Sequence, residues 1–363
     1  MRNRNLSILA AVLVLVPGLS AQTLKYPDTR KVDVVEDYHG TKVADPYRWL
    51  EDQNAPETAA WVNAENGVTF PYLNTLPERD QIRKRLTELW NYERYSVPFR
   101  EGGRYFFSRN SGLQNQSVLY MQKTLRDSAR VLLDPNQLSS DGTVALASIA
   151  VSPDGKLLGY GTAASGSDWN EFHVRDIATG QDRSDLVQWV KFSGMNWTKD
   201  GRGFIYSRYP EAQESEKLKA ALANQALYYH VVGTPQSADK LVYARPDQPS
   251  WFVNGDITED GRYLLLYIRE NTDPRNRLYY IDLKNPKKPD LSKPVVKLVD
   301  NNDAAHGVIG NEGPVLFVLT NRNAPHQKVV AVDTRKPGQA KTIIPETEEV
   351  LTSVQVAGNR FFA

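Results

Sequence analysis

Six tight glycine turns recur along most of this chain, and an aromatic or aliphatic run directly follows each of them. The turns read EGGRYFF, SPDGKLLGY, TKDGRGFIY, TEDGRYLLL, NEGPVLFVL and AGNRFFA, with glycines at positions 103, 155, 201, 261, 313 and 358. Glycine reaches positive φ without steric cost, so pairs such as Asp-Gly suit the turn of a β-hairpin. Their average spacing of about 50 residues is typical of a β-propeller with one four-stranded blade in each repeat.

Alternating runs between the turns predict further strands of the same sheets. In four repeats such a run stands where a third strand would follow: 118–121, 173–177, 227–231 and 277–283. A period of two is typical of a strand with one buried face. We therefore predict a mainly β chain, in which residues 95–363 form about five propeller blades and the start of a sixth. An irregular β-sandwich with chance spacing is the alternative, and six similarly built turns disfavour it.

The sixth repeat has only begun its first hairpin when the sequence stops at Ala363. A propeller covers its blade faces and strand edges by closing into a ring. A ring interrupted inside a blade would leave apolar faces and unpaired backbone groups exposed. We therefore expect the propeller to be truncated, with the residues that complete the ring missing from this sequence.

Residues 22–94 show a helical period instead of an alternating one. The pattern predicts a first helix that begins near Glu57 and ends near Gly67. A second helix is indicated by apolar residues at helical spacing: Ile82, Leu86, Leu89 and Trp90. We assign residues 22–94 to an N-terminal helical segment.

The first residues have the pattern of a secretory signal peptide. Basic Arg2 and Arg4 precede an apolar run at residues 6–16. The small residues Ser20 and Ala21 follow it, so we assign residues 1–21 to the signal peptide. The apolar run is too short to span a bilayer, and no other segment reaches the roughly 18 apolar residues that a membrane helix needs. We expect a periplasmic or secreted protein with no membrane partner.

Composition excludes several functional classes. The 44 basic and 43 acidic residues leave a net charge of +1, which is too little for the positive field of a nucleic-acid-binding protein. The chain has no cysteine, so disulfides, thiolate metal sites and a cysteine nucleophile are impossible. No H-E-x-x-H or other metal-ligand spacing occurs. We expect no nucleic-acid partner, no metal and no cofactor.

Seven stretches together resemble, in order and with plausible spacing, the N-terminal half of the prolyl oligopeptidase family. They are DYHGTKVADPYRWLED (37–52), NSGLQNQSVLY (110–120), LLDPNQLSSDGTVAL (132–146), ASGSDWNEFHV (164–174), VKFSGMNW (190–197), ALYYHVVGT (226–234) and YIRENTDPRNRLYY (267–280). The resemblance implies a seven-bladed propeller inserted into an α/β-hydrolase domain. The helical segment 22–94 would then belong to that hydrolase domain, which is otherwise absent.

The resemblance also implies an activity for a longer parent protein. That parent would be a serine endopeptidase that cleaves short peptides on the carboxyl side of proline through an acyl-enzyme, with the propeller as a size-selective lid. Its partners would be proline-containing oligopeptides and the missing C-terminal hydrolase domain. Two other classes stay open: a periplasmic β-propeller that acts as a binding or scaffold protein, and a non-catalytic regulatory fragment.

The catalytic residues of such an enzyme are not recognisable in this chain. No G-x-S-x-G nucleophile turn occurs, and the nearest run, residues 164–169, lacks its flanking glycines. Ser165 and Ser167 are therefore interpreted as turn residues. The histidines are scattered, and none shares a motif with a serine and an acid: His39, His173, His230, His306 and His326. We expect the chain to be catalytically silent.

Four residues match substrate-binding positions of the family. Arg269 matches the arginine that reaches the backbone of the bound peptide, and a surface arginine in an ordinary salt bridge is the alternative. Phe192 and Phe252 match the apolar pocket for the third residue before the scissile bond, and core aromatic residues are the alternative. Thr272 falls where some members place a reactive cysteine, so sensitivity to thiol reagents should be lost.

Asp168 and Trp169 match residues at the interface between the two domains of the family, where they would latch the domains together. A buried tryptophan beside a turn aspartate is an equally simple structural interpretation.

Overall fold

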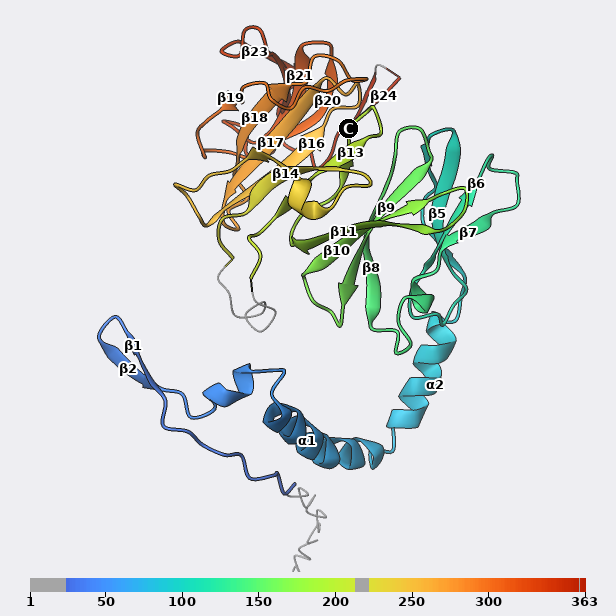
Figure 1. Ribbon diagram of the computed structural model, residues 1–363, viewed down its shortest axis with the longest axis vertical. Helices are drawn as coiled ribbons and strands as arrows, with labels where there is room; N and C mark the ends of the chain where they lie inside the picture. Colours follow the sequence, from blue (N-terminus) through green and yellow to red (C-terminus); the bar gives the residue numbers. More distant parts are fainter. Residues whose placement is uncertain (1–23, 213–221, 359) are drawn as a thin grey trace, which may run out of the picture. The chain divides into compact units, whose positions relative to one another are not determined.

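The computed structural model describes residues 24–212, 222–358 and 360–363 (Figure 1). The predicted signal peptide 1–21 lies outside the described residues. The chain divides into two compact units, Met1–Glu88 and Leu89–Ala363, which are described separately. None of the described helices is long and apolar enough to cross a membrane.

The first unit contains a hairpin as well as helices. Its elements are β1 (Val35–Tyr38), β2 (Thr41–Ala44), the 3-10 helix η1 (Arg48–Glu51), α1 (Pro56–Asn74) and most of α2 (Arg79–Trp90). The hairpin was not predicted from the sequence, which we interpreted as helical throughout. Its turn places His39 at φ 54° and Gly40 at φ 88°, so this histidine lies in a tight turn.

Helix α1 continues past the predicted end. The prediction that it ends near Gly67 is wrong, because the helix runs through both Gly67 and Pro71 to Asn74. A glycine inside a helix costs only about 1 kcal/mol relative to alanine. The ring of Pro71 crowds the carbonyl four residues earlier, which belongs to Gly67. A glycine at that position gives the backbone freedom to adjust, so the two helix-breaking residues compensate for each other. Helix α2 forms where its apolar spacing predicts it.

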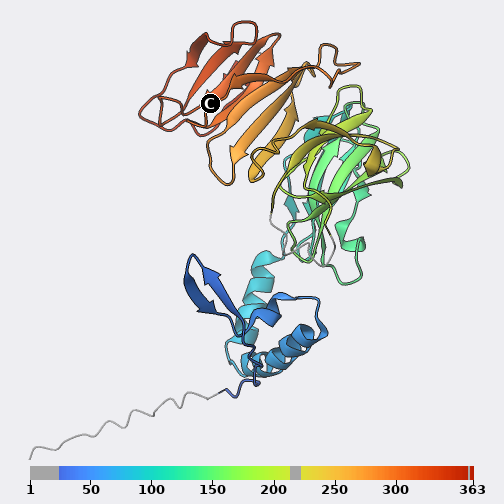
Figure 2. The ribbon, with the colours of Figure 1, turned by 60° about the vertical axis from the view of Figure 1, so that its left-hand side comes forward.

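The second unit consists of consecutive antiparallel sheets (Figures 1 and 2). Sheet 1 contains β3 (Arg94–Tyr95), β4 (Phe99–Glu101), β5 (Arg104–Asn110), β6 (Val118–Gln122) and β7 (Arg130–Leu133). Sheet 2 contains β8 (Val144–Val151), β9 (Leu157–Ala164), β10 (Asn170–Asp176) and β11 (Asp182–Val190). Sheet 3 contains β12 (Asn196–Trp197), β13 (Gly203–Arg208), β14 (Ala226–Val231) and β15 (Lys240–Tyr243).

The remaining strands continue the same plan. Sheet 4 contains β16 (Trp251–Ile257), β17 (Tyr263–Glu270), β18 (Arg277–Asp282) and β19 (Val296–Val299). Sheet 5 contains β20 (His306–Glu312), β21 (Val315–Thr320), β22 (Lys328–Asp333) and β23 (Ala340–Ile344). A last hairpin pairs β24 (Gln355–Ala357) with β25 (Arg360–Phe362). Two short 3-10 helices, η2 (Pro135–Gln137) and η4 (Gln236–Ala238), lie in connecting loops.

This plan confirms the predicted fold class. The glycine turn joins β4 to β5 in sheet 1 and the first strand to the second in the sheets that follow. The predicted further strands correspond to β6, β10, β14 and β18. Five complete sheets and the start of a sixth follow one another as propeller blades do. The described strands form a succession of small sheets, whereas a β-sandwich consists of two larger sheets.

A repeated side-chain pattern stabilises the glycine turns. In sheet 4, the Thr258 hydroxyl donates to Asp260 at 2.7 Å, and Asp260 accepts the backbone N–H of Arg262 at 3.0 Å. Two other turns repeat the pattern with Ser152, Asp154 and Lys156, and with Thr198, Asp200 and Arg202. The aspartate of each Asp-Gly pair therefore anchors its own turn, which explains why the motif recurs in the sequence.

Consecutive sheets pack face against face through four buried apolar clusters. Representative members from the two sides are Leu119 with Leu158, Val187 with Phe204, Leu227 with Leu264, and Leu265 with Leu316. Neighbours in a strand point to opposite faces, so Leu264 packs toward sheet 3 and Leu265 toward sheet 5. Both faces of sheet 4 are thus buried. For this reason the sequence of β17 is an almost continuous run of apolar residues.

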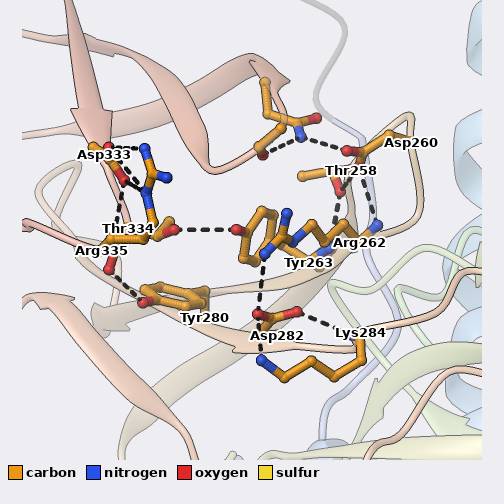
Figure 3. A network of polar contacts seen from close by, with 12 residues as sticks. Thr258, Asp260, Arg262, Tyr263, Tyr280, Asp282, Lys284, Asp333, Thr334 and Arg335 are labelled. Atoms are coloured by element: carbon orange, nitrogen blue, oxygen red, sulfur yellow. Dashed lines mark hydrogen bonds and ion pairs between the residues drawn. The ribbon is translucent and has the colours of Figure 1, made fainter.

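Polar contacts also join adjacent sheets at the end where the glycine turns lie. Figure 3 shows the network between sheets 4 and 5. The Tyr263 hydroxyl lies 3.0 Å from the Thr334 hydroxyl, and the Tyr280 hydroxyl donates to the Thr334 carbonyl at 3.1 Å. Asn311 of sheet 5 donates to Asp260 of sheet 4 at 2.7 Å. The turn of one sheet is therefore bound to the sheet that follows it.

A fully buried histidine links sheets 2 and 3. His230 of β14 places Nδ1 2.7 Å from Asp239 and Nε2 3.1 Å from Asp185 of β11. A neutral imidazole has one N–H group, so two hydrogen bonds to carboxylates require the doubly protonated ring. Burial opposes this charge, but the hydrogen bonds to both aspartates outweigh it and raise the pKa of His230 to about 9. Tyr206 completes the site by donating to Asp239 at 2.6 Å.

We predict that this contact makes stability decrease at alkaline pH. The pKa of His230 is about 9 in the folded chain and 6.5 as an ordinary value, so its contribution is fully present below about pH 6.5 and is lost as the pH rises through 9. The difference corresponds to an upper bound of about 3 kcal/mol. Urea unfolding at several pH values should show this loss in the parent chain and not in His230→Gln. His173→Gln, which alters a half-buried strand histidine, is the control that should keep it. A free energy of unfolding that stays constant between pH 7 and 10 would contradict the assignment.

Candidate functional site

All six predicted site residues lie at the end of the sheets opposite the glycine turns, which we call the distal end. In each sheet the first strand begins there, the second ends there and the third begins there. Asp168 and Trp169 lie between β9 and β10, Phe192 follows β11, Phe252 is in β16, Arg269 is in β17, and Thr272 follows β17. The antiparallel plan therefore brings residues about 100 positions apart to the same end.

Three of these residues form one group. The rings of Phe192 and Phe252 lie 5.8 Å apart, tilted by 36°. Phe252 is the register partner of Arg269, so the two side chains stand on the same face of sheet 4. Phe192 is 48% exposed, which is unlike a core aromatic residue. The exposed Arg269 has no ion pair within the part of the chain that the structure describes. An aromatic pair with a nearby cation is thus open to solvent.

Lys191 connects this group to the other predicted residues. Its ammonium lies 3.4 Å from the Asp168 carboxylate, 5.4 Å from the centre of the Trp169 ring and 5.2 Å from that of Phe192. Contacts of this kind combine an ion pair with two cation–π interactions. Lys191 was not predicted from the sequence, although it directly precedes Phe192 in the VKFSGMNW stretch.

The position of Phe192 depends on residues of sheet 3. Phe192 has a φ of 57°, a conformation that costs a bulky residue about 1–3 kcal/mol. The buried Gln225 donates to the Lys191 carbonyl at 3.0 Å and accepts the Val253 N–H at 2.8 Å. Its amide therefore joins the backbone before Phe192 to the backbone after Phe252.

A serine pair makes a second link of the same type. The Ser207 hydroxyl donates to the Val253 carbonyl at 2.5 Å, and the Ser207 N–H donates to the Ser193 hydroxyl at 2.8 Å. Neither Ser207 nor Gln225 was predicted from the sequence. No motif marks them, because both act through backbone groups of residues far away in the chain.

Two arginines pack on the opposite face of the β16–β17 pair. Trp251 lies between the guanidinium groups of Arg245 and Arg277, at 4.4 Å and 4.1 Å from its ring centre. Arg277 also forms an ion pair with Glu270 at 2.7 Å. Trp251 and Glu270 are register partners, so this brace lies behind the Phe252–Arg269 face.

Thr272 lies apart from the aromatic pair. It is an exposed residue of the turn after β17, next to Asn271 at φ 54°. Among the described residues, no hydrogen bond joins its side chain to Phe192, Phe252 or Arg269. The structure thus brings together five of the six predicted residues, with Lys191 between them, and leaves Thr272 at the margin.

Ser167, His173 and His306 make contacts that are typical of structural residues. The Ser167 hydroxyl accepts the Trp169 N–H at 3.1 Å, as expected of a turn serine. His173 lies 3.3 Å from the Thr162 hydroxyl, and His306 lies 3.1 Å from that of Thr320. Burial lowers the pKa of both histidines. Over residues 24–212, 222–358 and 360–363, no group of three or more His, Asp or Glu side chains is placed to hold a metal ion.

Comparison with known proteins agrees with this architecture. A family model described as the N-terminal β-propeller domain of prolyl oligopeptidase matches residues 26–363. The chain belongs to the prolyl oligopeptidase family. The prolyl endopeptidase of Elizabethkingia meningoseptica is 37% identical over 361 residues, which are 99% of this chain and 50% of that protein.

A fungal branch of the prolyl oligopeptidase family is also similar. The dual function macrocyclase-peptidase POPB of Galerina marginata is 33% identical over 93% of this chain and 50% of that protein. A solved structure of prolyl oligopeptidase B from the same fungus, bound to a 35mer hydrolysis and macrocyclization substrate, aligns with a TM-score of 0.80 and 32% identity, covering 93% of this chain and 50% of that one. The chain spans about half the length of the curated relatives it matches.

We predict that Gln225→Ala destabilises the chain and loosens the aromatic pair. The substitution leaves the Val253 N–H buried without its acceptor, which should lower the free energy of unfolding by about 1–3 kcal/mol. Gln339→Ala, at an exposed position, is the matched control and should change it by less than about 0.5 kcal/mol. Urea unfolding measures both, and an equal effect of the two variants would show that the Gln225 bridge has no role.

Proposed function

We propose that this chain is the N-terminal portion of a serine endopeptidase that cleaves short peptides on the carboxyl side of proline. The observation that carries the proposal is the convergence of Phe192, Phe252 and Arg269 at the distal end, in a chain of the prolyl oligopeptidase family. Relatives that match nearly the whole chain carry the names prolyl endopeptidase and prolyl oligopeptidase.

The side chains of Phe192, Phe252 and Arg269 have the chemistry needed to bind an extended peptide. The guanidinium of Arg269 presents several fixed N–H donors and can bind carbonyl oxygens of a peptide backbone. The exposed ring of Phe192 and the half-buried ring of Phe252 can cover an apolar side chain, which we assign to the third residue before the scissile bond. Backbone binding beside an apolar contact gives affinity without demanding one particular sequence.

The catalytic step itself we assign to residues beyond this chain. The sequence contains no G-x-S-x-G turn, so the nucleophile, its histidine and its acid would belong to a C-terminal hydrolase domain. In this proposal the propeller is the lid that admits short peptides and excludes folded proteins. Export through the signal peptide at residues 1–21 would place the enzyme in the periplasm or outside the cell.

A feature of the N-terminal unit favours the presence of such a partner domain. The apolar residues of the part of α2 in this unit are exposed, among them Ile82 and Leu86. An apolar stripe on a helix normally packs against another element. We propose that the hydrolase domain covers it, which would explain why a propeller chain begins with helices.

We predict that the 363-residue chain does not hydrolyse a fluorogenic Gly-Pro peptide and that the longer protein does. Activity of the longer protein should disappear with a serine-directed phosphonylating reagent, because the proposed nucleophile is a serine hydroxyl. Release of the fluorophore measures both. Hydrolysis by the 363-residue chain, or failure of the longer protein to cleave any proline-containing peptide, would overturn the proposal.

In the longer protein, Arg269→Ala should lower kcat/KM for the same peptide about tenfold or more. A hydrogen bond to a charged group is worth about 1.5–3 kcal/mol, and this one would be made to the substrate backbone. Arg275→Ala is the matched control, because Arg275 is an exposed arginine of the following turn that already pairs with Asp273. If both variants lose activity equally, Arg269 has no specific contact with the peptide.

A further inference from the structure

A pocket of about 230 Å³ lies between sheets 4 and 5. Strand β19 lines it from sheet 4, and strands β21, β22 and β23 line it from sheet 5. The described residues that form its lining do not include Phe192, Phe252 or Arg269, so it differs from the group assigned to the substrate above. A water molecule occupies about 30 Å³, and the pocket can therefore hold a ligand of several heavy atoms.

Short side chains on the last strand of sheet 5 leave this space open. Ala340 and Thr342 of β23 are the register partners of Val332 and Val330 of β22. Partners of this kind stand on the same face of a sheet, and here it is the face that packs against sheet 4. Alanine and threonine are too short to reach Leu298 of β19, which lines the pocket from the other side. The body of the pocket is thus walled mainly by aliphatic groups.

The distal end of the pocket is polar instead. Thr320 at the end of β21 is the register partner of Lys328 at the start of β22 and of His306 at the start of β20. Arg322 and Asn323, in the loop after β21, line the same end. The pairing of three strands therefore places hydrogen-bonding side chains together at one end of an apolar space.

The charge at this end is positive. Lys328 contributes an ammonium to the lining, and it has no ion pair within the part of the chain that the structure describes. Arg322 is paired with Asp303 at 3.1 Å, so the carboxylate beside this end is already compensated. An anion that enters the pocket would give Lys328 the partner that the described residues do not supply.

His306 adds a buried donor at the same end. The ring is 5% exposed, and its Nδ1 lies 3.1 Å from the Thr320 hydroxyl. That hydroxyl accepts the Arg322 N–H at 3.1 Å, and its own proton is satisfied when it donates to Nδ1. Burial lowers the pKa of His306, so the ring is neutral and its proton is then on Nε2.

This Nε2–H group lacks an acceptor. Nε2 of His306 is buried and has no hydrogen bond within the described residues. Its distance to the Asp303 carboxylate is 3.9 Å, which is too long for a hydrogen bond. Buried donors in native proteins are nearly always satisfied. An acceptor bound at the polar end of the pocket can approach this donor as well as Lys328.

We propose that this pocket binds a small aliphatic carboxylic acid. Its carboxylate lies at the polar end, with Lys328 and His306 as donors, and its hydrocarbon body packs against Leu298, Val318 and Val330. A charge-assisted hydrogen bond to the ammonium gives the carboxylate an advantage over a neutral group. An inorganic anion would leave the aliphatic wall uncovered. The proposal goes beyond the proposed function and does not rest on it.

The test measures binding of isocaproate to the 363-residue chain by isothermal titration calorimetry. Isocaproate, which is leucine without its amino group, should bind. Its neutral isostere isocaproamide should bind about tenfold more weakly or less, because it cannot pair with the ammonium. Acetate should lose a similar factor, because it lacks the hydrocarbon body. Equal binding of isocaproate and either of the other two probes, or no binding of isocaproate, overturns the proposal.

Two variants locate the binding on this pocket. Lys328→Met keeps the hydrocarbon stem, so it should weaken isocaproate about tenfold or more and leave isocaproamide unchanged. Ala340→Leu fills the gap at an exposed position and should weaken both probes. Lys341→Met is the matched control, because this exposed lysine is a strand neighbour of Ala340 and points to the opposite face. Equal effects of Lys328→Met and Lys341→Met would reject the site.

A last arm separates the two sources of such a group, which are a free acid and the C-terminal residue of a peptide. Acetyl-leucine carries a peptide bond next to the carboxylate and the same aliphatic side chain. If it binds as tightly as isocaproate and loses this affinity in Lys328→Met, the pocket takes a peptide C-terminus. If it binds about tenfold more weakly, the pocket takes a free acid. Binding without hydrolysis by the longer protein would reject only the peptidase, and hydrolysis without binding would reject only the pocket.

Discussion

The packing of each sheet against the next is the interaction on which the rest of this structure depends. A four-stranded sheet with two apolar faces cannot be stable alone, because each buried leucine or phenylalanine contributes about 1.5–3 kcal/mol only when a neighbouring sheet covers it. Leu264 and Leu265 illustrate this, since adjacent positions of β17 serve two different interfaces. The order of the sheets then fixes which loops meet at the distal end, and with them the candidate site.

The sequence pattern predicts the sheets well because every repeated turn needs a residue with positive φ. Gly155 has a φ of 67° and Gly201 a φ of 68°, and an added Cβ at Gly201 would meet no other atom within 4 Å. Backbone conformation alone therefore selects glycine at these turns, and the signal repeats with each sheet. The prediction fails in the N-terminal unit, where Gly67 and Pro71 look like a helix end but occur together inside α1. Local signals are reliable when a single constraint acts on them and misleading when two compensate.

The sequence predicts the candidate site only in part, because some of its residues act through contacts between different sheets. Arg269, Phe192 and Phe252 were found because they match positions of a known family, and the geometry does place them together. Gln225 and Ser207 bind backbone atoms, so their role has no counterpart in a motif. The contact between His230 and Asp185 spans 45 residues, and a histidine within a strand does not reveal that two carboxylates face it. Contacts that depend on the packing of different sheets become visible only in three dimensions.

This dependence on packing also fixes the geometry of the aromatic pair formed by Phe192 and Phe252. Phe192 follows the last strand of sheet 2, and Phe252 lies in the first strand of sheet 4, yet the bridge between their backbones is made by Gln225 and Ser207 of sheet 3. The separation of the two rings is therefore set by a third sheet that contributes no side chain to the pair. A change in the packing of sheets 2, 3 and 4 must break these hydrogen bonds before the rings can move apart. Because the bonds are buried, breaking them leaves polar groups unsatisfied, so the aromatic pair is held near one separation and adapts poorly to larger groups. Under the proposed function, selectivity at the distal end would follow from the stiffness of the sheet interfaces as much as from the residues assigned to the peptide.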